Sequence, residues 1–436
     1  MLLNIVTGLT GYCLKQISTI ILIILLGGKA AFGDYKVALY SSLILTVFLN
    51  LGMQTVAGYY LRRYINSQDL PSIVTISLWL SRIIVLYGLP ITLILFTLGY
   101  IHQYGLNYLD FHDLETHPAT LSLIGAMVMM CYKLSALGIS AYGYTRLRTL
   151  TFNSIPFITA FLAYIHSQMY GNTSPILAFF YYVCITAFAT CMFAVIFAKK
   201  SGWSKRLSHA TTHPDNKRWK EIAVSGFFAT LCYQVNTCFI LLFVEHFSWL
   251  FKENLVGFIA VALTLINGSY SITTPMFLDL KNILIDLSSS KSQELALSAH
   301  KKLRIYFASF FIYAALLFIF APQILGLFFS DVTPYEIFVL RVAALVQPFT
   351  LMTVQIGQFV SVLLGSKQIM KQAYISTILP VVLISIMGFL FHAPGLFVGD
   401  FFAGLLSTIF FVGKMHQALG FDIFNVFKKP GKVSPV

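Results

Sequence analysis

Residues 17–26 read Ile-Ser-Thr-Ile-Ile-Leu-Ile-Ile-Leu-Leu, a run that carries no charge and does not alternate. Its flanks extend it to an expected span over 5–27, long enough to cross a hydrocarbon core of about 30 Å as a helix. A barrel strand would alternate apolar and polar residues over about ten positions, and residues 316–320 do not alternate either. Because only helices and closed barrels satisfy their backbone in lipid, the sequence predicts membrane helices.

The composition of the whole chain gives the same result. Of its 436 residues, 58% are hydrophobic and 10% are charged, whereas soluble domains have about 25% charged residues. The formal net charge of +13 is not gathered into a patch for nucleic acid but spread over the loops described below. We therefore expect an all-α integral membrane protein that binds no nucleic acid.

Hydropathy and helix breakers place about twelve transmembrane helices along the chain. We expect them at 5–27, 37–61, 73–100, 119–143, 151–169, 175–198, 221–244, 255–279, 304–322, 335–364, 372–392 and 395–417. The distribution of Lys and Arg tests this arrangement. With both termini in the cytoplasm, the inner segments hold 22 of the 29 cations and the outer segments three. This excess agrees with the positive-inside rule, loop by loop.

The two longest inner loops are 199–220 and 280–303, and the first of them, which is basic and polar, divides the chain into two halves. We expect an N-terminal six-helix lobe at 1–198, a cytoplasmic linker at 199–220, a C-terminal six-helix lobe at 221–417 and a cytoplasmic tail at 418–436. Two such halves are a common plan of secondary transporters. The basic turns that begin at Gly143 and Gly365, each followed by a helix with an internal Pro, support a repeat.

Three cations near the middle of their spans are the strongest candidates for function: Lys15, Arg82 and Lys133. Each costs roughly 2.5–3.5 kcal/mol on insertion scales, so intramembrane charges usually have a role. No acidic residue lies at their depth in the same half. A packing role between helices is an open alternative for any one of them. For all three together we favour a cavity that attracts an anion.

Other polar residues within spans have weaker functional readings. Arg341 and Asp400 lie five or six residues from the outer edge, which favours a structural ion pair, or an Arg that snorkels to the interface, over a substrate site. Gln355, Gln358 and Asn236 are candidates for a sugar path, although Asn and Gln within spans often only join helices. The small residues Gly395, Gly399 and Ala403 repeat every four positions, which predicts close approach of a neighbouring helix.

No motif for an enzyme or a metal site is present in the sequence. It contains no Gly-x-x-x-x-Gly-Lys-Ser/Thr loop for nucleotide phosphates and no His-Glu-x-x-His zinc motif. The six cysteines lie inside apolar runs without metal-ligand spacing. We expect neither catalysis nor a cofactor or metal.

Short motifs in order along the chain carry a family resemblance. They are Leu26-Gly-Gly, Phe32-Gly-Asp-Tyr, Asn50-Leu-Gly-Met, Lys220-Glu-Ile-Ala-Val-Ser-Gly, Phe320-Ala-Pro-Gln-Ile-Leu-Gly-Leu-Phe-Phe-Ser, Phe338-Val-Leu-Arg-Val-Ala-Ala-Leu, Gly365-Ser-Lys and Pro394-Gly-Leu-Phe-Val-Gly. Together they resemble the polysaccharide exporters, or O-antigen-type flippases, of the multidrug/oligosaccharidyl-lipid/polysaccharide (MOP) superfamily. The resemblance spans nearly the whole chain.

The resemblance implies two six-helix lobes around a cavity in a bacterial inner membrane. It also implies flipping of a polyprenyl-pyrophosphate-linked oligosaccharide for surface polysaccharide synthesis, with a polymerase and other assembly proteins as further partners. Lys15 falls where related flippases keep a cation for the pyrophosphate. Family members often carry an acid in span 7, but here the segment from Gln234 reads Gln-Val-Asn-Thr, which places cation coupling there in doubt.

Two alternatives stay open at this point. A drug antiporter of the same superfamily would need intramembrane acids, and only Asp400 qualifies. A membrane-embedded polysaccharide polymerase would need a large outer loop, whereas the longest expected here covers about 102–118.

Overall fold

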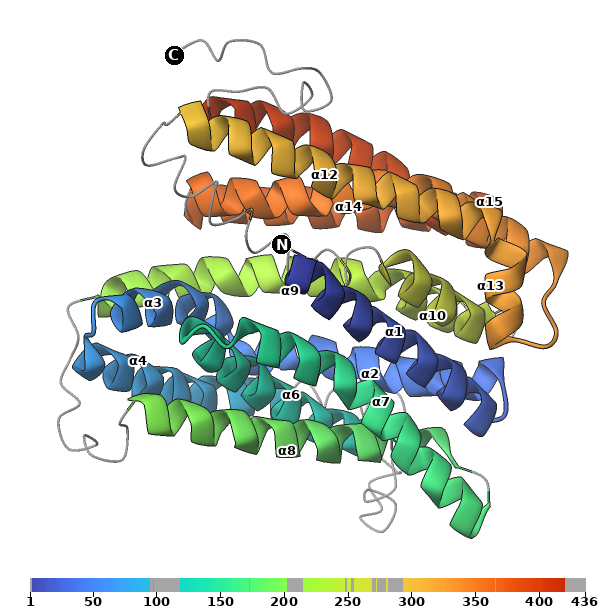
Figure 1. Cartoon of the computed structure of the whole chain (residues 1–436), viewed down its shortest axis with the longest axis horizontal. Helices are drawn as coiled ribbons and strands as arrows, with labels where there is room; N and C mark the ends of the chain where they lie inside the picture. The colour runs from blue at the N-terminus through green and yellow to red at the C-terminus, as the bar shows by residue number, and fades with distance from the viewer. Residues whose placement is uncertain are drawn as a thin grey trace. The chain divides into compact units, whose positions relative to one another are not determined.

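The computed structural model describes residues 2–94, 97, 118–171, 173–201, 215–247, 249–251, 255–268, 272, 280, 293–364 and 366–419. These residues form helices joined by short turns, with no strand among them (Figure 1). The elements are α1 (Leu2–Leu25), α2 (Lys29–Asn50), α3 (Met53–Asn66), α4 (Leu70–Ile83), the π-helix η1 (Ile84–Gly88), α6 (Pro118–Ala141), α7 (Thr145–Tyr170), α8 (Pro175–Ser201), α9 (Asn216–His246), α10 (Leu255–Ile266), α12 (Gln293–Ile319), α13 (Ala321–Phe328), α14 (Pro334–Leu364) and α15 (Ser366–Leu419).

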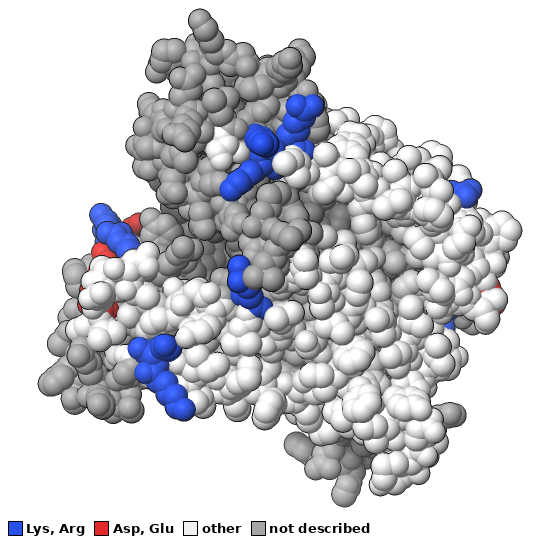
Figure 2. Space-filling view, in the orientation of Figure 1, with Lys and Arg blue, Asp and Glu red and all other residues white. Residues whose placement is uncertain are grey.

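The predicted all-helical membrane fold is confirmed. Within the described ranges, eight helices are long and apolar enough to cross a membrane. Every expected span overlaps one or more helices, and two of the spans share α15. On the face shown in Figure 2, most of the described surface carries no charged side chain. An uncharged surface of this kind suits contact with lipid, so the chain is a multi-span membrane protein.

The helices belong to two compact units. Unit 1 comprises Met1–Ile20 and Phe239–Val436, and unit 2 comprises Ile21–Cys238. The division therefore falls inside α1 and inside α9, not in the polar segment 199–220. The lobes expected at 1–198 and 221–417 stay a prediction, and the tail 418–436 lies outside the described residues except for its first two.

Unit 2 contains two helix irregularities that touch each other. The expected span 37–61 is broken between α2 and α3, where Leu51 (φ 45°) and Gly52 (φ 77°) are both left-handed. The next span contains η1, and Gly88 at its end packs directly on the carbonyl of Leu49. A Cβ at Gly52 would also collide with the carbonyl of Ala223. Only glycine suits position 52, because it tolerates the positive φ and has no side chain to collide with Ala223.

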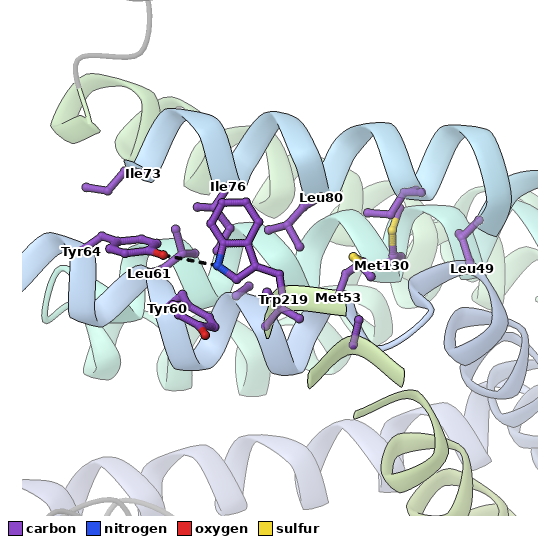
Figure 3. Packing of buried hydrophobic residues seen from close by; sticks show 14 residues of the cluster. Leu49, Met53, Tyr60, Leu61, Tyr64, Ile73, Ile76, Leu80, Met130 and Trp219 are labelled. Carbon is purple, nitrogen blue, oxygen red and sulfur yellow. Dashed lines mark hydrogen bonds between the residues drawn. The ribbon is translucent and has the colours of Figure 1, made fainter. Parts of the chain in front are cut away.

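A buried aromatic cluster fixes α3, α4 and the start of α9 together in unit 2. Trp219 is 1% exposed, and its ring centre lies 5.4 Å from that of Trp79 in α4. Trp219 also packs against the rings of Tyr60 and Tyr64, with centroids 6.1 and 6.4 Å away (Figure 3). Its Nε1 donates to the Tyr64 hydroxyl at 3.3 Å, and that hydroxyl donates to Asp215 Oδ2 at 3.0 Å. Burial raises the pKa of Tyr64 above its ordinary value, and Asp215 raises it further. The hydroxyl is therefore a protonated donor at neutral pH.

Replacing Tyr64 by Phe tests this cluster. The change removes the two hydrogen bonds of the Tyr64 hydroxyl, to Trp219 and to Asp215, and at about 0.5–1.5 kcal/mol for each bond the loss is about 1–3 kcal/mol. We expect the Tyr64→Phe protein to be destabilised by that amount in SDS-induced unfolding of the detergent-solubilised chain. Tyr170→Phe, at a tyrosine that is 73% exposed, is the matched control. Equal stability of the two variants would show that the Tyr64 hydroxyl contributes nothing.

In unit 1, α15 folds back on itself as a helical hairpin. His392 (φ 55°, ψ −140°) interrupts the helical backbone. After it, Gly395 lies against Met387 and Gly399 against Leu383. In each contact the two residues lie about equally far along the sequence before and after the turn. The two halves therefore run antiparallel, with Pro394 at the beginning of the second half. An added Cβ at either glycine would meet backbone atoms of the other half, which confirms the predicted close helix approach.

Adding a methyl group at this contact should separate the two halves. For Gly399→Ala we expect a loss of about 1–3 kcal/mol, the usual cost of overpacking a close-packed contact. Gly326→Ala in α13 is the control, because nothing lies within 4 Å of a Cβ built there. It should be neutral or stabilising by about 0.4–1 kcal/mol. The SDS concentration at the unfolding midpoint measures the stability of both variants. A Gly399→Ala protein as stable as wild type would contradict the tight packing.

Candidate functional site

Lys133 is the predicted site residue with the most complete surroundings. It lies in the middle of α6, is half-buried, and interacts electrostatically with the Cys238 thiol of α9. Gln234, one turn before Cys238, donates from Nε2 to its sulfur at 3.2 Å. The thiol points to the carbonyl of Tyr40 in α2 at 4.0 Å. Three helices of unit 2, α2, α6 and α9, thus have a group that interacts with the Cys238 thiol or carries it.

The chemistry of this cluster suits an anion. Among the described residues, no carboxylate pairs with Lys133, and the thiol with which it interacts is itself bonded to an amide and to a carbonyl. An ammonium group has three donors and no acceptor. A phosphate oxygen would supply both the opposite charge and the acceptors that the neighbours provide poorly. The cluster is therefore a place where a phosphate group would lower the cost of a buried charge.

Lys15 lies in unit 1, on a polar stripe of α1. Tyr12, Lys15, Gln16 and Thr19 share one face by helical spacing. Thr19 donates to the carbonyl of Lys15 at 2.9 Å. The hydroxyl of Tyr12 is 2.8 Å from that of Tyr313 in α12. In the part of the chain that the structure describes, no acidic side chain pairs with Lys15, and the buried amide of Gln16 has no hydrogen bond.

The third predicted cation, Arg82, has a different environment. Its side chain is exposed, in the last turn of α4 directly before η1. A π-helix often marks a functional place in a helix, but it is not itself a ligand site. Among the residues of unit 2 that the structure describes, no contact joins the guanidinium to Lys133 or Cys238.

The structure does not bring Arg341 and Asp400 together. Arg341 donates from Nε to the carbonyl of Phe318 at 3.3 Å, with the guanidinium carbon 5.5 Å from the Phe318 ring centre. Asp400 instead has the side chain of Thr350 beside it. No ion pair joins the two residues in the described part of unit 1, because depth alone does not set which way a side chain points around its helix.

The predicted sugar-path residues are placed only by their backbone. Gln355 and Gln358 lie in α14 and Asn236 lies in α9, and their side chains fall outside the described structure. The residues that sequence reasoning missed are Tyr40 and Cys238. No pattern in the sequence indicated that α2 and α9 meet at the Cys238 thiol with which Lys133 interacts.

Comparison with known proteins supports the fold. No protein-family model matches the chain, and no curated protein is detectably similar in sequence. Among solved structures, a crystal structure of MATE in complex with MaD5 aligns with a TM-score of 0.65 at 15% identity, covering 98% of this chain and 95% of that one. An outward-facing multidrug resistance MATE family transporter of the MOP superfamily gives 0.62 at 16% identity, covering 98% and 95%.

A flippase is also among these similar structures. The lipid II flippase MurJ, in an inward closed conformation, aligns with a TM-score of 0.62 at 13% identity, covering 100% of this chain and 94% of that one. The match extends over nearly the full length of each protein. The chain therefore has the fold of MOP transporters.

Proposed function

We propose that this protein is a flippase that moves a polyprenyl-pyrophosphate-linked oligosaccharide from the inner to the outer leaflet of a bacterial inner membrane. The observation that carries the proposal is the pair of intramembrane lysines, Lys15 and Lys133, each without an acidic partner among the described residues. Buried cations of this kind are costly unless an anion meets them. The similarity to a lipid II flippase supports the same reading.

The mechanism follows from charge and from the bilayer. The lipid-linked sugar enters from the inner leaflet, and its polyprenyl tail stays in the lipid. Lys133 and Lys15, each within its own unit, offset the desolvation of the pyrophosphate, and the exposed Arg82 attracts it during entry. Gln355, Gln358 and Asn236 are proposed to contact the sugar. Outward movement of the negative headgroup is favoured by about 2.3 kcal/mol per charge per 100 mV of inside-negative potential.

The MATE structures favour a second candidate, efflux of small organic molecules. An organic cation would be held by an intramembrane acid, and Asp400 is the one acid deep in the described spans. Two lysines without acidic partners would repel such a cation. The charges therefore favour a phosphate-bearing substrate. In this proposal both termini and the basic loops lie in the cytoplasm. A polysaccharide polymerase then acts on the product.

Deletion of the gene in its own host tests this function. Single repeat units should accumulate on polyprenyl lipid at the cytoplasmic side, and surface polysaccharide should disappear. Mass analysis of extracted lipid-linked species and surface glycan typing measure both, with re-expression of the intact gene as the control. Normal surface polysaccharide in the deletion strain would exclude this role and favour small-molecule efflux.

A further inference from the structure

Three helices of unit 2, α6, α7 and α8, carry cations but no acid. Residues 116–214, which include all three helices, contain no Asp or Glu. Four of the cations lie at helix ends: Arg146 and Arg148 in the first turn of α7, and Lys199 and Lys200 in the last turn of α8. Figure 2 shows basic side chains at this end of α8. We call these four residues the basic corner.

Two contacts join the helix ends at the basic corner. The ammonium of Lys200 lies 5.9 Å from the ring centre of Tyr144, in the turn between α6 and α7. Arg148 donates from Nη1 to Ser140 Oγ, near the end of α6, at 3.5 Å. The side chains of Lys199 and Lys200 are exposed. The end of α6, the start of α7 and the end of α8 therefore form one basic surface.

The basic corner lies about one membrane thickness from the other end of the same helices. There, His166 of α7 and Tyr181 of α8 are hydrogen-bonded, with 3.1 Å between Nδ1 and the hydroxyl. His166 follows Arg148, and Tyr181 precedes Lys199, by the same number of residues, which corresponds to about 27 Å at 1.5 Å per residue. A hydrocarbon core is about 30 Å thick. The corner is therefore at the level of the phospholipid headgroups.

Exposed apolar side chains continue from the basic corner toward the middle of the membrane. Phe152, four residues after Arg148 in α7, is 55% exposed, and Val195, four residues before Lys199 in α8, is 53% exposed. Residues four apart lie on the same face of a helix. Each helix thus presents a cation with an apolar side chain deeper on the same face. This order matches the phosphate and the acyl chain of a lipid.

The charges of the corner favour an anion that comes from outside the protein. Like charges held close together repel each other, and the helices that carry them provide no acid. The beginning of α9 is different, because its three cations lie between two acids along the sequence: Asp215, Lys217, Arg218, Lys220 and Glu221. A basic group at a helix end, without acids in its own helices, suits a lipid phosphate.

We propose that the basic corner binds an anionic phospholipid, with cardiolipin as the preferred lipid because its two phosphates match four cations. The phosphate oxygens accept hydrogen bonds from the guanidinium and ammonium groups, and the acyl chains lie along Phe152 and Val195. The bound lipid holds the ends of α6, α7 and α8 together. In the orientation proposed above, it belongs to the cytoplasmic leaflet. This inference does not depend on what the protein transports.

Native mass spectrometry of the full chain tests the site. With equimolar cardiolipin, phosphatidylglycerol and phosphatidylcholine added in detergent, the wild-type protein should retain cardiolipin most, phosphatidylglycerol less and phosphatidylcholine least. The Arg146→Gln, Lys199→Gln, Lys200→Gln triple variant should bind cardiolipin roughly a hundredfold more weakly, since each cation near an anionic lipid is worth about a factor of five. Equal retention of the three lipids by the wild-type protein overturns the proposal.

A second triple variant controls for net charge. Lys217→Gln, Arg218→Gln, Lys220→Gln removes three exposed cations from the start of α9 and should retain cardiolipin like the wild type. Circular dichroism establishes that both triple variants are folded. If the two variants bind cardiolipin equally well, the basic corner is not its site.

Lysine acylation of the wild-type protein tests the same site without any substitution. Cardiolipin should slow the reaction of Lys199 and Lys200 with a water-soluble acylating reagent at least fivefold, and leave Lys217 and Lys220 unchanged. Peptide mass spectrometry measures each lysine separately. Unchanged rates at Lys199 and Lys200, or equal protection of all four lysines, would contradict the proposal. Stronger protection by polyprenyl pyrophosphate than by cardiolipin would make the corner a substrate entry site and overturn the phospholipid assignment.

Discussion

Replacing Lys15 and Lys133 together by Met should abolish export of the lipid-linked glycan and leave the protein folded. Each charge-assisted contact to a phosphate is worth about 1.5–3 kcal/mol. Loss of both therefore corresponds to roughly a hundredfold or greater drop in rate, at 1.36 kcal/mol per factor of ten. Export is measured by complementation of the deletion strain and by flipping in liposomes.

Stability and charge controls separate this effect from misfolding. Removing two intramembrane charges that have no acidic partner among the described residues should not lower the unfolding midpoint, because each charge is costly in lipid. Arg at both positions keeps the charge and should retain part of the activity. Lys200→Met, at an exposed lysine in the last turn of α8, should have no effect. Full export by the double Met variant would reject the anion role of both lysines.

Truncating Trp219 to Ala should give the largest loss of stability in unit 2. The side chain is almost fully buried against the ring of Trp79 and the rings of Tyr60 and Tyr64, of which Figure 3 shows the two tyrosines. Substitutions of this type cost 3–5 kcal/mol, because apolar contacts are lost and a cavity remains. Titration with SDS, followed by circular dichroism so that loss of the tryptophan signal does not interfere, measures the change.

Trp249 provides the matched control for this substitution. Its side chain is 76% exposed, so Trp249→Ala should change the stability in detergent by no more than about 0.5 kcal/mol. If the two variants unfold at the same SDS concentration, the Trp219 cluster does not hold α3, α4 and α9 together.

Much of the fold could be predicted from the sequence because length and hydropathy decide it. Helix boundaries were less accurate. The second span was expected from residue 37, whereas α2 begins at Lys29 and includes Lys36, whose ammonium lies 5.2 Å from the ring centre of Phe32. Hydropathy assigns such cations to a loop, although an aromatic face can accommodate them within a helix. The break at Leu51–Gly52 also has no hydropathy signal.

The candidate site could be predicted only in part, because the sequence shows the depth of a residue in the membrane but not the helices that its side chain faces. Lys15 and Lys133 were identified by depth, which sequence reveals. Their partners depend on how helices are rotated and packed, so the contact of Tyr40 with Cys238, and the interaction of Cys238 with Lys133, could not be foreseen. The same limit explains why Arg341 and Asp400, expected to pair, have different neighbours.

Flipping by the purified protein in liposomes tests the central proposal most directly. A fluorescent polyprenyl-pyrophosphate sugar is placed in both leaflets, and a membrane-impermeant quencher is added outside. We predict that protein-free liposomes lose only the outer-leaflet signal, whereas those containing the wild-type protein lose nearly all of it. The Lys15→Met, Lys133→Met double variant should behave like protein-free liposomes. Wild-type protein that leaves the inner-leaflet signal untouched, with or without an imposed membrane potential or ion gradient, would contradict the flippase function.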